Sequence, residues 1–202
     1  IAGSTNDLSY TTNASGSWQS ASIDSTGDVG SECFIALDSN DDIHIIYRDT
    51  TNTDLKYATK TLAASILASN WDLSAADNNG QVGNFGSIAI DSQDRLHIAY
   101  FSGTGTELKY GTKASDSSTW SNEVVDTCDN VGKYTSIQVD SNDKPHITYS
   151  DHTNTEMKYA HKMGASWTVS TLDSTTSSGS GTSLAIDSND HLHVAYKTNS
   201  TE

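Results

Sequence analysis

The 202-residue chain has a formal net charge of −15 and contains one proline, two cysteines and four tryptophans. Nucleic-acid binding depends on Lys and Arg releasing phosphate counterions, so this acidity argues against nucleic acid and an anionic membrane surface as partners. No apolar run reaches the roughly 18 residues of a membrane span. The acidic, Ser/Thr-rich chain begins at Ile1, and we expect a processed, secreted, extracellular product.

One pattern recurs four times along the chain. At 136–162 it reads SIQVDSNDKPHITYSDHTNTEMKYAHK, and further copies occupy 34–60 and 87–113. The fourth copy is split: its first half lies at 183–202, and residues matching its second half lie at 6–13. Successive turn aspartates are 53, 49 and 47 residues apart, and the four tryptophans have the same spacings. A period of roughly 40 to 50 residues is typical of propellers and of repeat arrays whose units stack on each other.

Each copy predicts four short strands. Two alternating apolar runs flank an Asp-Ser-x-Asp turn and predict a hairpin, because Asp and Asn side chains bond turn amides. A third strand carries Leu or Met two residues before Tyr, and a fourth strand contains the tryptophan and ends six residues later at another aspartate. Four such strands make one up-and-down blade. The markers are Asp38, Asp91, Asp140 and Asp187 in the turns, Trp18, Trp71, Trp120 and Trp167, and the final Asp24, Asp77, Asp126 and Asp173.

We therefore predict an all-β fold in which residues 1–202 form a single β-propeller domain of four four-stranded blades. The first and last segments share one blade, which leaves no open sheet edge. Two arrangements satisfy this condition: one chain closes as a four-bladed ring, or two chains exchange ends in an eight-bladed ring. The predicted repeats are about 14–60, 61–113, 114–162, and 163–202 together with 1–13.

The two cysteines bear on the ring size. Cys33 lies at the entrance of one inner strand, and Cys128 lies in the connection to the inner strand two blades later. These entrances face each other in a ring of four, so a disulfide within one chain would favour the small ring, given that bonded cysteines have Cα atoms within about 7 Å. The alternative is that both thiols are small buried hydrophobes.

The connections between blades combine a constant glycine with variable neighbours. Gly30, Gly83, Gly132 and Gly179 each precede the next turn aspartate by eight residues, which predicts a backbone setting that only glycine adopts cheaply, or a close approach. The residues after the glycine differ between copies, as do the loops after the second strands, and binding residues gather on such loops. Unconstrained solvent loops are the alternative. The candidate ligand-binding residues are Glu32, Asn84, Phe85, Lys133 and Tyr134, with Asp49, Asp151 and His152 from the second loops.

The order of an apolar run, DSxD, HxxY and LKYAxK resembles the repeats of secreted bacterial and metagenomic propellers of the sialidase-like and lectin-like kind. The resemblance covers the whole chain and concerns architecture. It implies a binding scaffold or, as in some members, a glycoside hydrolase.

The repeated side chains are interpreted first as structural. Copies on separate blades do not converge on one metal, so we expect His44, His97, His146 and His193 to bond neighbouring backbone, Tyr or Trp between blades. We expect the turn aspartates to organise hairpins, with calcium binding as the alternative. We expect the tryptophans to pack between blades, with sugar stacking as the alternative. Apart from that calcium, the sequence predicts no cofactor and no metal site.

The function predicted from the sequence is noncatalytic recognition of carbohydrate or a surface polymer through the variable loop face. One alternative is a structural module that forms oligomers, including a homodimer made by exchange of the terminal blade. A second is a glycoside hydrolase, which needs two carboxylates roughly 5 to 10 Å apart. A sialidase mechanism needs clustered arginines, and the chain has only Arg48 and Arg95. No GxSxG, Walker or HExxH motif is present, and we expect no catalytic residue.

Overall fold

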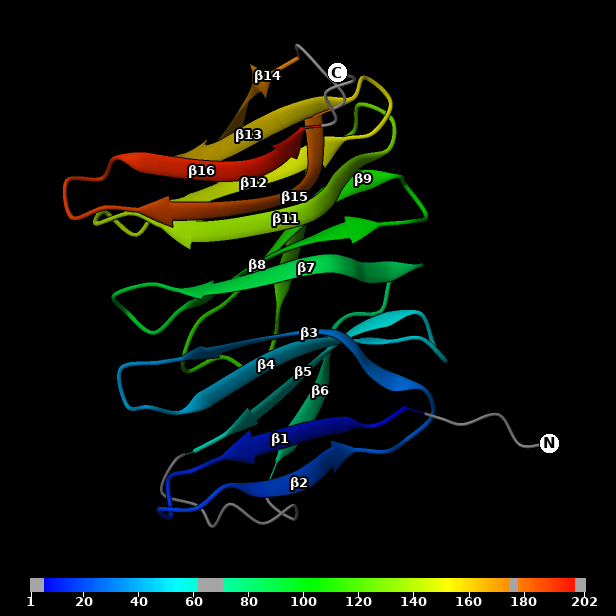
Figure 1. Cartoon of the computed structure of the whole chain (residues 1–202), viewed down its shortest axis with the longest axis vertical. Helices are drawn as coiled ribbons and strands as arrows, with labels where there is room; N and C mark the ends of the chain where they lie inside the picture. The colour runs from blue at the N-terminus through cyan, green and yellow to red at the C-terminus, as the bar shows by residue number, and fades with distance from the viewer. Residues whose placement is uncertain (1–5, 62–70, 175–177, 199–202) are drawn as a thin grey trace.

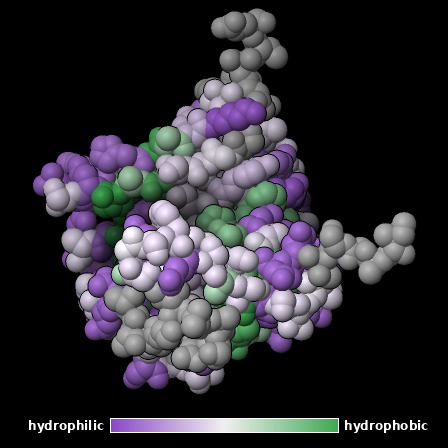
Figure 2. All heavy atoms as spheres, turned by 60° about the horizontal axis from the view of Figure 1, so that its bottom comes forward, coloured by the Kyte–Doolittle hydropathy of each residue, from purple (hydrophilic) through white to green (hydrophobic). Residues whose placement is uncertain are grey.

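The computed structural model describes residues 6–61, 71–174 and 178–198, and these form an all-β fold of sixteen strands. Every strand pair is antiparallel. In the described ranges no helix is long and apolar enough to cross a membrane. On the face shown in Figure 2, the coloured residues are mostly hydrophilic or intermediate, and hydrophobic residues show as separate patches.

Twelve of the strands form three four-stranded sheets, as the repeats predict. Blade 1 consists of β3 (Val29–Leu37), β4 (Ile43–Asp49), β5 (Asp54–Lys60) and β6 (Asp72–Asp77). Blade 2 consists of β7 (Val82–Ile90), β8 (Leu96–Ser102), β9 (Glu107–Lys113) and β10 (Ser121–Asp126). Blade 3 consists of β11 (Val131–Val139), β12 (Pro145–Asp151), β13 (Glu156–Met163) and β14 (Ser166–Asp173).

The remaining four strands form two separate two-stranded sheets. The head half-blade pairs β1 (Leu8–Thr12) with β2 (Gln19–Asp24), and the tail half-blade pairs β15 (Ser178–Ile186) with β16 (Leu192–Thr198). The first strands β3, β7, β11 and β15 follow one another through the stack, and the two half-blades lie at its opposite ends (Figure 1). The blade that we expected the two ends to share is therefore not formed within this chain.

The hydrophobic core lies between consecutive blades. One buried cluster joins Leu8 of the head half-blade to Tyr47 of blade 1, a second joins Ile46 of blade 1 to Tyr100 of blade 2, and a third joins blades 2 and 3 around Tyr149. All three tyrosines are fully buried. A blade has two faces and cannot cover both by itself, so stacking supplies the core that each repeat lacks.

The tryptophans pack between blades, as expected, in three of the four copies. A tyrosine on the third strand of one blade meets the tryptophan of the next blade edge to face, a favoured aromatic geometry. The ring centroids are 5.0–5.4 Å apart in the pairs Tyr10–Trp71, Tyr57–Trp120 and Tyr110–Trp167. Trp18 differs, because 73% of its surface is exposed.

A buried polar contact, which we call the clamp, also joins neighbouring blades. Asp126 at the end of β10 accepts a hydrogen bond from the Tyr149 hydroxyl at 2.6 Å and pairs with the Lys158 ammonium at 2.8 Å. Burial opposes ionisation of Asp126, but the bonds from Lys158 and Tyr149 outweigh it and hold the pKa of this carboxyl below its ordinary value. The same clamp recurs as Asp24–Tyr47–Lys56 and Asp77–Tyr100–Lys109.

The repeated glycines satisfy both reasons predicted for them. Gly30, Gly83 and Gly132 have φ of +87°, +92° and +95°. A Cβ atom on Gly132 would lie 2.6 Å from the Cα atom of Leu108 on the preceding blade, and Gly30 and Gly83 make the same approach to the preceding third strand. A side chain at these positions would push neighbouring blades apart. The surroundings of Gly179 lie outside what the structure describes.

Cys33 and Cys128 are free thiols, and both are exposed. They therefore form neither the disulfide nor the buried hydrophobic positions that we considered from the sequence. The thiols provide no link across a ring.

Candidate functional site

The first strands of the three complete blades and of the tail half-blade line one hollow of about 410 Å³. Its volume falls within the roughly 300–1,000 Å³ of small-molecule sites. Each sheet contributes residues from the segment that follows its repeated glycine. The lining residues are Glu32 and Phe34 from β3, Phe85 and Gly86 from β7, Tyr134 and Thr135 from β11, and Gly181 and Thr182 from β15.

One backbone position is strained in the same way in each complete blade. Glu32, Phe85 and Tyr134 have φ of +50°, +55° and +52°, and each lies within a register shift between the first and second strands. The equivalent residue of the tail half-blade is Gly181, with φ of +91°. The left-handed region is costly for bulky side chains, and such strain concentrates at functional sites. The repeat therefore presents four different residues at the hollow from one shared backbone shape.

The variable residues form a connected group at this hollow. The rings of Phe85 and Tyr134 lie 4.6 Å apart, and Tyr134 stacks on His152 at 5.8 Å. The Glu32 carboxylate accepts a hydrogen bond from the Phe85 N–H. Burial lowers the pKa of His152, and Lys133 lowers it further. Five of the eight residues predicted from the sequence thus lie together.

The aromatic group also has a cationic side chain and an amide beside it. The ring of Phe101 on β8 lies 6.2 Å from that of Phe85, and the Lys133 ammonium lies 5.3 Å from the Phe101 ring centre. Asn84, a sixth predicted residue, is half-buried and pairs in register with Phe101. Phe101 was not among the residues predicted from the sequence, although its place directly after the HxxY tyrosine is occupied by unrelated residues in the other copies.

The other two predicted residues have a different role. Asp49 and Asp151 are 2% and 1% exposed. Asp49 accepts hydrogen bonds from the backbone and side-chain amides of Asn52 at 2.9 and 2.8 Å, and Asp151 holds its own loop in the same way. Because buried carboxylates need such partners, we assign both residues to loop structure rather than to the binding surface.

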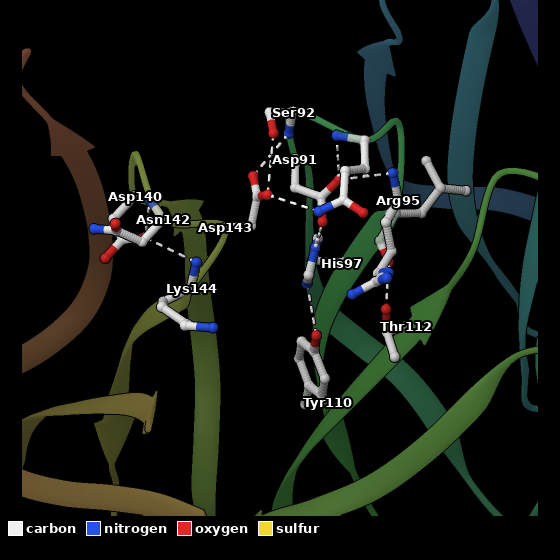
Figure 3. Close-up of polar contacts among 12 residues, drawn as sticks. Asp91, Ser92, Arg95, His97, Tyr110, Thr112, Asp140, Asn142, Asp143 and Lys144 are labelled. Carbon is white, nitrogen blue, oxygen red and sulfur yellow. Dashed lines mark hydrogen bonds and ion pairs between the residues drawn. The ribbon is translucent and has the colours of Figure 1, made fainter. Parts of the chain in front are cut away.

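In each complete blade, the repeated histidine lies between a tyrosine and an aspartate of the same blade. His97 Nδ1 lies 2.6 Å from the Tyr110 hydroxyl, and its Nε2 lies 3.1 Å from the Asp91 carboxylate (Figure 3). Burial lowers the pKa of His97, against the raising effect of Asp91. The neutral ring thus accepts from Tyr110 and donates to Asp91. His44 and His146 contact tyrosines at the same 2.6 Å, so the histidines have the structural role we expected, with partners inside the blade rather than between blades.

The DSxD turns organise their hairpins and also link blades. Asp91 accepts from the amides of Gln93 and Arg95, which is the predicted turn chemistry. In addition, Ser92 donates from its backbone N–H and hydroxyl to Asp143 of the next blade, at 3.0 Å each (Figure 3). We call this contact the turn lock, and it recurs as Ser39–Asp94 and Ser141–Asp190. In the part of the chain that the structure describes, no group of three His, Cys, Asp or Glu residues is placed to hold a metal.

Solved structures share this architecture. An intramolecular trans-sialidase from leech superposes with a TM-score of 0.53 at 15% identity, over 80% of this chain and 27% of its own. The intramolecular trans-sialidase from Ruminococcus gnavus gives 0.54 at 17% identity, over 81% of this chain and 38% of its own. An ulvan lyase gives 0.51 at 10% identity, over 75% and 45%. No protein-family model and no curated protein matches the sequence. At these identities the likeness shows the fold alone, which is stacked blades of the propeller kind. This chain spans less than half of the length of each of these enzymes.

Proposed function

We propose that this chain is a noncatalytic carbohydrate-recognition module that binds its ligand in the hollow between the first strands. The observation that supports it is the strained position occupied by Glu32, Phe85 and Tyr134, where the side chain varies and the backbone does not. A purely structural position would be filled by glycine, as it is at Gly181. Aromatic side chains occupy this position despite the energetic cost of a left-handed backbone, and ligand binding would explain why.

The lining suits a sugar ring. Phe85 and Tyr134 supply apolar faces, and the Glu32 carboxylate and the Tyr134 hydroxyl are polar groups of the lining residues. Binding sites commonly combine mostly apolar walls with a few placed polar groups. The acidic chain and Glu32 favour a neutral sugar over an anionic one, because a like charge would be brought into a desolvated site. The carbohydrates named in complex with the leech trans-sialidase and the ulvan lyase support the ligand class.

The chemistry of the hollow also favours binding over hydrolysis. Glu32 is the one acidic side chain among the described lining residues. Retaining and inverting glycosidases need two carboxylates about 5 to 10 Å apart. We therefore favour carbohydrate recognition over the alternative of a glycoside hydrolase.

The proposal is tested on an array of neutral and sialylated oligosaccharides, followed by calorimetric titration of the best ligand. We expect a neutral sugar to bind, and Tyr134→Ala to weaken it by at least about 10-fold, as loss of a central aromatic contact does. The control is Met163→Ala, which removes a 70% exposed side chain at the end of β13 and should leave affinity unchanged. Absence of any binder at millimolar sugar, or equal affinity in Tyr134→Ala, would contradict the proposal.

A further inference from the structure

The two half-blades are complementary parts of one blade. In each complete blade the second strand pairs with the third, as β8 does with β9. The tail half-blade holds the counterparts of a first and second strand, and the head half-blade holds those of a third and fourth. Among the described strands, none pairs with the outer edge of β16 or with that of β1. An unpaired strand edge is a template for another strand.

Side chains at these two ends are uncovered although their counterparts are core residues. Tyr196 on β16 is 37% exposed, whereas Tyr100 at the same place in blade 2 is fully buried. Leu192 is 36% exposed, against 1% for its counterpart Leu96. Trp18, the exposed tryptophan, lies just before β2 at the other end. The two ends therefore carry the residues of a blade interior with half of the blade removed.

We propose that the head half-blade of a second copy of this chain completes the tail half-blade, with β1 pairing antiparallel to β16. The pairing of β8 with β9 sets the register. Since Ala99 lies opposite Tyr110, Ala195 would lie opposite Tyr10 of the second copy. The aromatic and apolar residues of the two ends then cover one another.

Three contacts that recur inside the chain are each completed by this pairing. Tyr10 of the second copy reaches His193, as Tyr110 reaches His97. Trp18 of the second copy packs on Tyr159, as Trp167 packs on Tyr110. Asp41 of the second copy accepts from Ser188, as Asp143 accepts from Ser92. The three missing partners are thus found at the opposite end of the same sequence.

The geometry of the stack favours a second copy over closure of one chain. The half-blades lie at opposite ends of the stack (Figure 1), and the rotation between blades is fixed by the clamps, the glycine approaches and the turn locks. Bringing the two ends of one chain together would require a different rotation between blades and would therefore disturb these contacts. A head-to-tail interface forms a ring when its rotation closes. Two copies supply eight blades, which is within the range of about four to eight known for propellers.

The test is disulfide trapping in a Cys33→Ser, Cys128→Ser background of the full chain. We introduce Ser188→Cys and Asp41→Cys, oxidise, and measure the mass without reductant. The proposal expects a covalent species of twice the 21.6 kDa chain mass. A cross-linked species of single-chain mass would mean that one chain closes on itself, and a ladder of higher multiples would mean an open polymer. Either result, or unreacted thiols, overturns the two-copy ring.

A matched pair within one chain controls for geometry and folding. Ser92→Cys with Asp143→Cys occupies the same turn lock between blades 2 and 3, and should oxidise to a single-chain product. Without covalent linkage, sedimentation of the unmodified chain at about 50 µM should give the dimer mass, because exchange of two half-blades buries two interfaces. Trp18→Ala should shift this equilibrium toward monomer by at least about 10-fold, as truncation of a central interface tryptophan does. A monomeric unmodified chain would overturn the proposal independently of the cysteine variants.

Discussion

Replacing Asp126 by Asn tests how strongly the clamp holds neighbouring blades together. The amide keeps the shape of the side chain and an oxygen for the Tyr149 hydroxyl, but removes the charge opposite Lys158. Breaking a buried ion pair costs about 3–5 kcal/mol. Lys158 keeps a second carboxylate, Asp151, at 3.9 Å, so we expect the lower end, about 3 kcal/mol in the free energy of unfolding. In a domain of this size that loss lowers the Tm by about 6–12 °C.

Urea titration of four proteins measures this effect: the unmodified chain, Asp126→Asn, Lys158→Met and the double variant. The double variant should recover most of the loss, because the uncompensated charge is gone. The pKa of Asp126 is lowered, so its contribution is complete above its ordinary 3.8 and is lost as pH falls through the folded value. The pKa of Lys158 is raised, so its contribution is complete below 10.5 and is lost as pH rises through the folded value. A loss below about 1 kcal/mol in Asp126→Asn would refute a clamp that stabilises the stack.

Three further predictions follow from backbone and histidine geometry. In urea titration, Gly132→Ala should lower the free energy of unfolding by about 3 kcal/mol, because of backbone strain and overlap with the preceding blade. The control Gly16→Ala, which has open space around its Cβ, should lower it by only about 1 kcal/mol. Equal losses would contradict the close approach. In the same assay, Tyr134→Gly should be more stable than Tyr134→Ala by about 1 kcal/mol, because only alanine is strained by the left-handed backbone. In an ordinary strand position alanine would be the more stable of the two. The pKa of His97 is lowered from 6.5, so the unfolded chain binds a proton more readily, and stability should fall as pH drops below that value. Between pH 7 and pH 5, His97→Asn should therefore lose less free energy of unfolding than the unmodified chain does.

The sequence predicted the features that repeat within a blade. Alternation predicted the four strands, the DSxD turns predicted the hairpins, and Gly30 and Gly132 indicated a positive φ before the structure showed it. These features depend on neighbours a few residues away, which periodicity records directly. Phe85 and Tyr134 were singled out for a related reason, because their variation stands out only against a constant repeat, and the structure places both at the hollow.

Contacts between blades were not predictable in the same way. The partners of Asp126, at Tyr149 and Lys158, lie 23 and 32 residues away, and nothing in a strand pattern states which faces of two sheets will meet. Asp151 was predicted as a binding residue because its loop varies between copies, but its side chain is buried and bonds amides of that loop. Whether a ring closes was the hardest feature to predict from the sequence, because closure depends on the sum of the rotations between successive blades.

The turn locks have a direction, since serine always lies on the earlier blade and aspartate on the later one. Duplication of one repeat in a gene would therefore deliver a blade whose couplings already fit the units before and after it. Lengthening or shortening such a chain requires no new recognition surface. The contacts between neighbouring blades therefore place no limit on the number of blades.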